Sequence, residues 1–213
     1  MPTESRNPAN DDTLIGVFRE ILKKNLQQTD DLIPARVVSF DRDANRVTVQ
    51  PMIQIIDTDG NHISRAQQTN MPVLLMGGGD FLLSFNLPAG SLGWIKSSDR
   101  DLSLFLREYQ ESPPNTYRLH SFEDGLFIPD VMTGVTFASE DSAALVIQNK
   151  SGTVRISLND DRIKLTAPLV DIAGNLNVSG TIVNGSINLT THNHTQPIDS
   201  GGNVEQPTST PQS

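Results

Sequence analysis

The sequence of 213 residues contains no cysteine at all. Disulfide scaffolds, thiol nucleophiles and thiolate metal sites are therefore excluded, which leaves the imidazole of histidine as the candidate nitrogen ligand for a metal. Aromatic residues are also scarce at 5%, and apolar residues reach only 36%. A core built from so few apolar side chains is thin for a chain of this length unless several chains share it.

Positive charge and long apolar runs are missing as well. The 16 Lys and Arg stand against 25 Asp and Glu, so the net charge of -9 disfavours attraction to a polyphosphate backbone. No run approaches the roughly 20 apolar residues that span a bilayer, and the polar residues 1–12 lack the apolar centre of a signal peptide. We therefore expect a soluble protein that is neither secreted through a signal peptide nor inserted in a membrane.

Residues 11–28 predict one amphipathic helix. Acidic and hydroxyl residues at positions 11–13 can cap its start, and apolar residues then recur at spacings of three and four. These residues are Leu14, Val17, Phe18, Ile21, Leu22 and Leu26. No second helix follows in the sequence, so we expect the apolar face to dock elsewhere.

Short alternating strands dominate the rest of the chain. Between residues 31 and 110, five or six strands are separated by turn signals, which indicates a Greek-key barrel of the oligonucleotide/oligosaccharide-binding (OB) type with a short helix at 99–109. Residues 111–139 contain three prolines and predict an extended connection. From 140 to 190, each burst offers two or three apolar side chains on one face, which indicates a solenoid or an intertwined multi-chain β-structure. An ordinary meander packed on the barrel is the alternative.

His192 and His194 follow the last predicted strand. In extended chain, residues i and i+2 point to the same face, so both imidazoles can reach one point. Two ligands make a weak site, but three chains meeting on an axis would place six nitrogens around one ion. That octahedral set suits an iron(II)-like or nickel-like ion better than four-coordinate zinc. A solvated strand end is the alternative interpretation.

The remaining motifs favour no catalysis. Residues 76–80 contain three glycines, but no Lys-Ser/Thr follows and the chain continues as a strand, so an ordinary turn is favoured over a phosphate loop. The acidic pairs Glu108 with Glu111 and Glu123 with Asp124 lie in polar stretches with nothing to raise their pKa values. No serine stands in a Gly-x-Ser-x-Gly context either. We expect no catalytic residue and no enzymatic activity.

Several motifs in this order carry a family resemblance. They are residues 76–90, 99–102, 117–129, 192–194, 201–203 and 206–208. Together they resemble the central spike proteins of contractile-tailed bacteriophages, the membrane-puncturing or baseplate assembly protein V group. The resemblance covers nearly the whole chain from about residue 30 onward.

The resemblance implies a mainly all-β homotrimer with five regions. These are a polar arm and helix (1–30), an OB-fold-like barrel (31–110), an extended connection (111–139), an intertwined trimeric β-helix (140–190) and an apex (191–213). It also implies that His192 and His194 of the three chains close the apex around one iron ion.

The resemblance further implies a mechanical role at the tip of the tail baseplate in the virion. The trimer would plug the tail tube at the baseplate hub protein and be driven through the host outer membrane when the sheath contracts, with no nucleic-acid partner. Some such spikes carry a cell-wall hydrolase domain, but the roughly 30 residues between 109 and 140 are too few for one. An OB-type module for glycan or single-stranded nucleic acid with a disordered tail is the other alternative, although one Trp and two Tyr give few stacking platforms.

Overall fold

The computed structural model describes residues 13–57, 60–192 and 201. The chain forms two units, Met1–Leu165 and Thr166–Ser213, which are described separately. Within the described ranges, no helix has both the length and the apolar character needed to cross a membrane.

Helix α1 (Leu14–Gln28) confirms the predicted amphipathic helix. Thr13 caps it, because its side-chain oxygen accepts a hydrogen bond from the backbone N–H of Gly16 at 3.0 Å. The helix ends at Thr29, whose backbone is extended. Its seven large apolar side chains are all between 46% and 74% exposed. The helix therefore does not bury its apolar face against the described residues of this chain.

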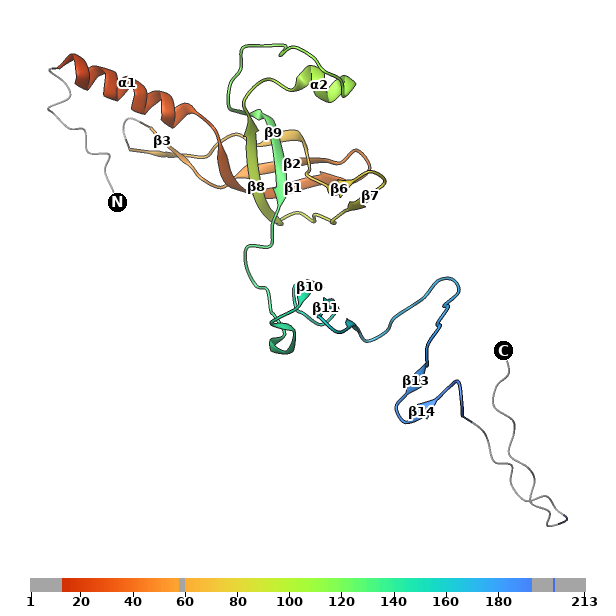
Figure 1. The fold of residues 1–213 in the computed structure, drawn as a ribbon. Coiled ribbons are helices and arrows are strands. Elements are labelled where there is room, and N and C mark those ends of the chain that lie inside the picture. Colours follow the sequence, from red (N-terminus) through yellow and green to blue (C-terminus); the bar gives the residue numbers. More distant parts are fainter. Residues whose placement is uncertain (1–12, 58–59, 193–200, 202–213) are drawn as a thin grey trace. The chain divides into compact units, whose positions relative to one another are not determined.

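A five-stranded antiparallel sheet forms a nearly closed barrel in the first unit (Figure 1). Its strand order is β5-β2-β1-β8-β9. The bounds are β1 Leu32–Asp41, β2 Arg46–Pro51, β5 Gln68–Pro72, β8 Leu92–Ser98 and β9 Ser121–Pro129. The segment after β5 reaches β9 across the open side, where the Leu74 N–H donates to the Phe127 carbonyl at 2.8 Å. The mainly β, barrel-like fold expected from the sequence is thus confirmed.

The barrel core is small and lies entirely between residues 35 and 127. Alternate residues of β2 and β8 point inward, as a half-buried strand requires. The buried apolar residues are Ala35, Val37, Val47, Val49, Met71, Val73, Leu87, Ile95, Phe122 and Phe127. Gly93 makes room for the fully buried Phe127, since a Cβ at Gly93 would lie 2.4 Å from that ring. The barrel completes this core without any residue of α1.

Two hairpins and a short helix extend from the barrel strands. They are β3 (Ile55–Ile56) with β4 (His62–Ile63), β6 (Met76–Gly78) with β7 (Phe81–Leu83), and α2 (Ser103–Glu108). Gly79 turns the second hairpin with a φ of +59°, which favours glycine. Strand β7 and not a helix follows this turn, so the glycine run is an ordinary turn, as predicted, and the short helix predicted near residues 99–109 is also present.

The structure differs from the sequence-based expectation at residues 111–139. An extended connection was expected there because of its prolines, but β9 (Ser121–Pro129) is the fifth strand of the barrel. Pro113 and Pro114 precede β9, and Pro129 is its last residue. Proline is tolerated at the end of an edge strand, where no ladder hydrogen bond is lost. Phe122 and Phe127 then supply the buried side chains that hold β9 in the barrel.

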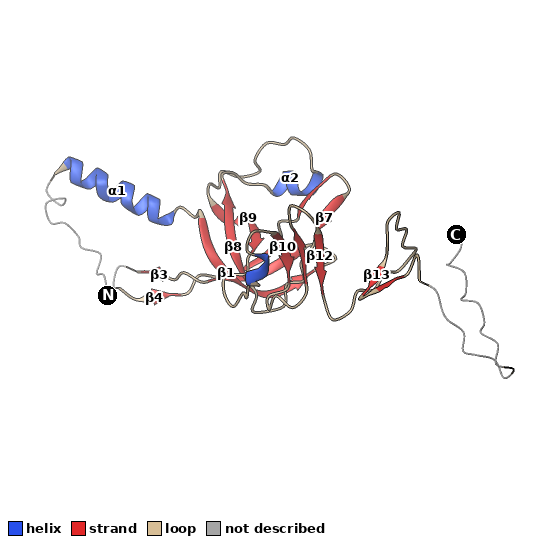
Figure 2. Ribbon diagram, turned by 60° about the horizontal axis from the view of Figure 1, so that its bottom comes forward, coloured by secondary structure: helices blue, strands red, loops and turns tan. Residues whose placement is uncertain are grey.

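A three-stranded sheet that is not hydrogen-bonded to the barrel sheet follows in the sequence, and its strands β10 and β12 are labelled in Figure 2. It consists of β10 (Leu145–Gln148), β11 (Arg155–Leu158) and β12 (Ile163–Thr166), preceded by a 3-10 helix at Ser139–Asp141. In the second unit, β13 (Val183–Asn184) and β14 (Ile187–Asn188) form one antiparallel hairpin. These antiparallel strands lie in the region that was expected to form a β-helix. The intertwined β-helix itself stays a prediction.

Candidate interaction surface and metal site

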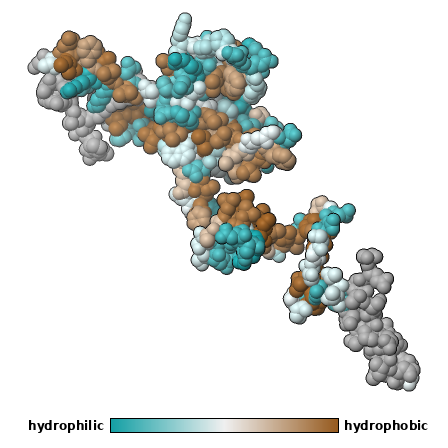
Figure 3. All heavy atoms as spheres, in the orientation of Figure 1, coloured by the Kyte–Doolittle hydropathy of each residue, from teal (hydrophilic) through white to brown (hydrophobic). Residues whose placement is uncertain are grey.

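One face of the β10–β12 sheet is apolar and open to solvent. Leu145 pairs with Leu158 and Ile147 pairs with Ile156 across β10 and β11, so their side chains share a face. Together with the two apolar residues of β12, they form what we name the apolar ladder: Leu145, Ile147, Ile156, Leu158, Ile163 and Leu165. Each member is between 38% and 69% exposed. Figure 3 shows apolar residues at the surface of this sheet and of α1.

The opposite face of the same sheet is polar and covered. Arg155 binds the carboxylates of Asp141 and Glu140 in the 3-10 helix, and Lys164 donates to Glu140 at 2.6 Å. Ser157, between them on β11, is completely buried. The hydrogen bond from Arg155 lowers the pKa of Asp141, and the one from Lys164 lowers the pKa of Glu140.

This arrangement reverses the usual one for a half-covered antiparallel sheet, in which the apolar face is packed and the polar face is solvated. The ion pairs fix the 3-10 helix on the polar face, so the apolar ladder is the face of this sheet that stays open. Exposed apolar surface of this kind marks an interaction site.

The second unit also exposes its apolar side chains. Its large apolar side chains are all at least 41% exposed, and among its described residues none is buried. They are Leu169, Val170, Ile172, Leu176, Val178, Ile182, Val183, Ile187 and Leu189. The backbone N–H of Leu189 donates to the carbonyl of Ile182 at 2.9 Å and extends the β13–β14 hairpin. A segment with nine exposed apolar side chains and no core of its own cannot be stable alone.

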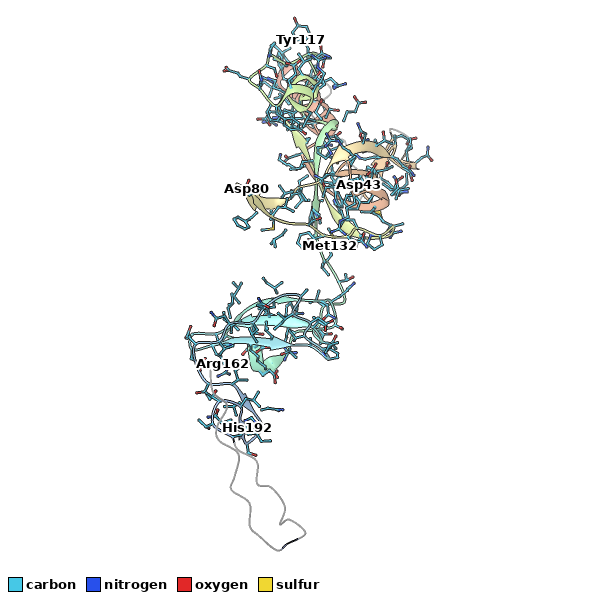
Figure 4. The ribbon with its side chains drawn as sticks, turned by 90° about the vertical axis from the view of Figure 1, so that its right-hand side faces the viewer. Asp43, Asp80, Tyr117, Met132, Arg162 and His192 are labelled. Atoms are coloured by element: carbon cyan, nitrogen blue, oxygen red, sulfur yellow. The ribbon has the colours of Figure 1, made fainter. Side chains whose placement is uncertain are left out.

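The hairpin positions His192, the first residue of the predicted metal pair (Figure 4). The His192 backbone N–H donates to the Asn188 carbonyl at 2.9 Å, and its ring Nδ1 lies 3.1 Å from the Leu189 carbonyl. A carbonyl only accepts, so Nδ1 is the donor in this contact. A ligating histidine commonly donates its other ring N–H to such a carbonyl.

The second residue of the pair, His194, lies outside the described residues. Within the described part of the chain, no group of three or more His, Asp or Glu could hold a metal ion. His192 has the local geometry of a ligand, but one imidazole is not a site, so the shared iron site stays a prediction.

A buried ion cluster that the sequence did not reveal fixes the loop carrying α2. Asp101 is buried and accepts hydrogen bonds from the Ser103 N–H at 2.8 Å and the Thr116 hydroxyl at 2.6 Å. Interactions with the Ser103 side chain, the Thr116 hydroxyl and the Ser103 N–H lower the pKa of Asp101. Arg118 approaches Asp101 to 3.5 Å and also binds Asp124 on β9. Asp101 lies 15 to 23 positions before Thr116, Arg118 and Asp124, and no periodicity links these residues, so no sequence pattern could have paired them. The cluster is structural in kind, because every carboxylate in it already has a donor.

Comparison with known proteins concerns the barrel. Residues 33–130 match the family model described as the phage protein Gp138 N-terminal domain. The matched range runs from β1 to just beyond β9, so it includes the strand at 121–129. No curated protein matches the chain. Over the barrel residues, the match agrees with the resemblance to phage proteins drawn from the sequence.

Proposed function

Because residues 33–130 match the N-terminal domain of phage protein Gp138, we propose that this chain is a structural virion component, the spike at the tip of a contractile tail. Three copies cap the tail tube at the baseplate hub protein. Contraction of the sheath drives the trimer through the host outer membrane. The sheath supplies the energy, so the chain needs no active site and is not an enzyme.

The exposed apolar side chains of the apolar ladder and, separately, those of residues 169–189 carry this proposal. Copies of the same chain offer a matching surface to one another, because a symmetric assembly brings identical faces together around its axis. Winding three chains together buries the apolar ladder and pairs strand edges between chains, which gives a stiff rod without open edges. A puncturing device needs such rigidity at its narrow end.

The metal ion would act as a structural pin. His192 and His194 of each chain would hold one iron ion on the axis, where chain ends otherwise fray. The position of His192 supports this role, since its ring Nδ1 lies 3.1 Å from the Leu189 carbonyl, the kind of contact that a ligating histidine commonly makes.

Native mass spectrometry of the full chain, reading subunit number and bound metal together, tests the proposal. We expect three chains and one iron-sized increment per trimer. The double substitution His192→Ala and His194→Ala should remove the increment, whereas the control His62→Ala, on the exposed strand β4, should keep it. A metal-free monomer would overturn the proposal and favour a small binding barrel instead.

A further inference from the structure

The apolar face of α1 is explained by neither the barrel nor the apolar ladder. At 100° per residue, its seven apolar residues cover a continuous stripe of about half the helix circumference. They are Leu14, Ile15, Val17, Phe18, Ile21, Leu22 and Leu26. An isolated helix of 15 residues is marginal in water, so this helix needs a surface to pack on.

The centre of this stripe identifies the kind of surface. Asn25 lies seven residues after Phe18 and four after Ile21, so its amide stands in line with the central apolar residues of the stripe. Covering the stripe with an apolar groove would bury this amide without a partner, which is costly. An identical helix in parallel places another Asn25 at the same height, and an amide offers both a donor and an acceptor.

The C-terminal end of α1 is held close to the barrel, which favours contact between the α1 helices of different copies. Only Thr29 separates α1 from Asp30, whose backbone N–H donates to the His120 carbonyl at 3.1 Å. The Asp30 carboxylate also binds Arg65 at 2.6 Å. Three barrels gathered by the apolar ladder would therefore hold three α1 helices on short tethers, at a high effective concentration.

We infer that α1 packs against the α1 helices of two other copies as a parallel three-helix bundle, with Asn25 facing Asn25 at its centre. The inference rests on the proposed trimer but adds a second contact at the N-terminal side of the barrel, independent of the apolar ladder and of the metal. The wide stripe favours three helices over two, because two helices cover only a narrow seam of each other.

The absence of cysteine allows a direct test in the full chain. Asn25→Cys places one thiol on the stripe, and Lys23→Cys places one on the opposite side of the same helix. Mild oxidation should convert about two thirds of the Asn25→Cys chains to disulfide-linked dimers, since three thiols around an axis form one pair. Lys23→Cys should give a several-fold lower yield. Dilution should not change the yield within a trimer.

Native mass spectrometry of both variants before oxidation separates the two proposals. Trimers that cross-link no better at position 25 than at position 23 would overturn the helix bundle and leave the spike trimer standing. Monomers in both variants and in the unaltered chain would overturn the trimer and the bundle together. Ile21→Cys, on the same stripe but without loss of the amide, repeats the test if Asn25→Cys alone disturbs the helix.

Discussion

Arg118 donates two hydrogen bonds of 3.0 Å to Asp124, from Nε and Nη2 to the two carboxylate oxygens. Both the Asp124 and the Asp101 carboxyl groups are removed from solvent, with side-chain exposures of 5% and 0%. The guanidinium thus compensates two buried carboxylates, and its pKa is raised by the hydrogen bond to Asp124. This one side chain fastens the loop between β8 and β9 to the barrel.

Arg118→Ala should therefore destabilise the barrel, because it leaves two buried carboxylates without their cation. We expect the melting temperature to fall by several degrees in a thermal unfolding experiment. Arg107→Ala is the matched control, since Arg107 pairs with Glu108 on the exposed side of α2 and should change little. Equal melting temperatures for the two variants would contradict the structural role of Arg118.

The sheet of the apolar ladder should lose stability in acid. In the folded state the pKa values of Asp141 and Glu140 lie below their ordinary values of 3.8 and 4.5. A lowered folded-state pKa means that the stabilisation is complete above the unfolded value and disappears as pH falls through the folded value. Unfolding followed between pH 6 and pH 2 should show loss of stability beginning near pH 4.5.

Asp141→Asn with Glu140→Gln should flatten that pH dependence and lower the stability at neutral pH. Asp160→Asn is the control, because Asp160 is an exposed turn residue in the same sheet. A pH profile unchanged in the double variant would show that other carboxylates control the acid sensitivity.

Regular periodicity made much of the fold predictable from the sequence. Features that depend on irregular tertiary contacts could not be predicted. Helix α1 and the β1–β2 hairpin follow directly from their spacing and from the turn at 41–45, where the Asp41 carboxylate accepts from the Ala44 N–H. Strand β9 was missed because neighbouring prolines suggested a connection, whereas Phe122 and Phe127 decide its place through packing. The Asp101–Arg118–Asp124 cluster depends on tertiary structure alone.

The candidate site divides in the same way. The histidine pair was evident from its spacing, and the apolar bursts from their period. The sequence did not predict which face of the β10–β12 sheet stays open. That depends on the ion pairs of Arg155 with Asp141 and Glu140, which lie more than ten residues away in the chain.

Packing at the centre of the barrel gives a third prediction. Gly93→Ala would place its Cβ 2.4 Å from the Phe127 ring and 2.5 Å from the Ile128 carbonyl oxygen, neither of which can move freely. Overpacking of this kind costs about 1–3 kcal/mol, measurable by urea unfolding. Gly78→Ala, where nothing lies within 4 Å of the added Cβ, is the control and should be near neutral. Equal stabilities would show that the core has room beside Phe127.

The last prediction concerns the apolar ladder, where the same substitution should have a small effect on a monomer and a large effect on a trimer. Ile147 is 57% exposed in the single chain, so Ile147→Asp should cost a monomer little. If copies cover this face, the same substitution buries an unpaired carboxylate at every interface and should prevent the trimer from forming. Sedimentation velocity should then show a shift from trimer to monomer. The control Asp160→Lys changes the charge at an exposed turn of the same sheet and should leave the trimer intact. A trimer that survives Ile147→Asp would show that this face remains open in solution.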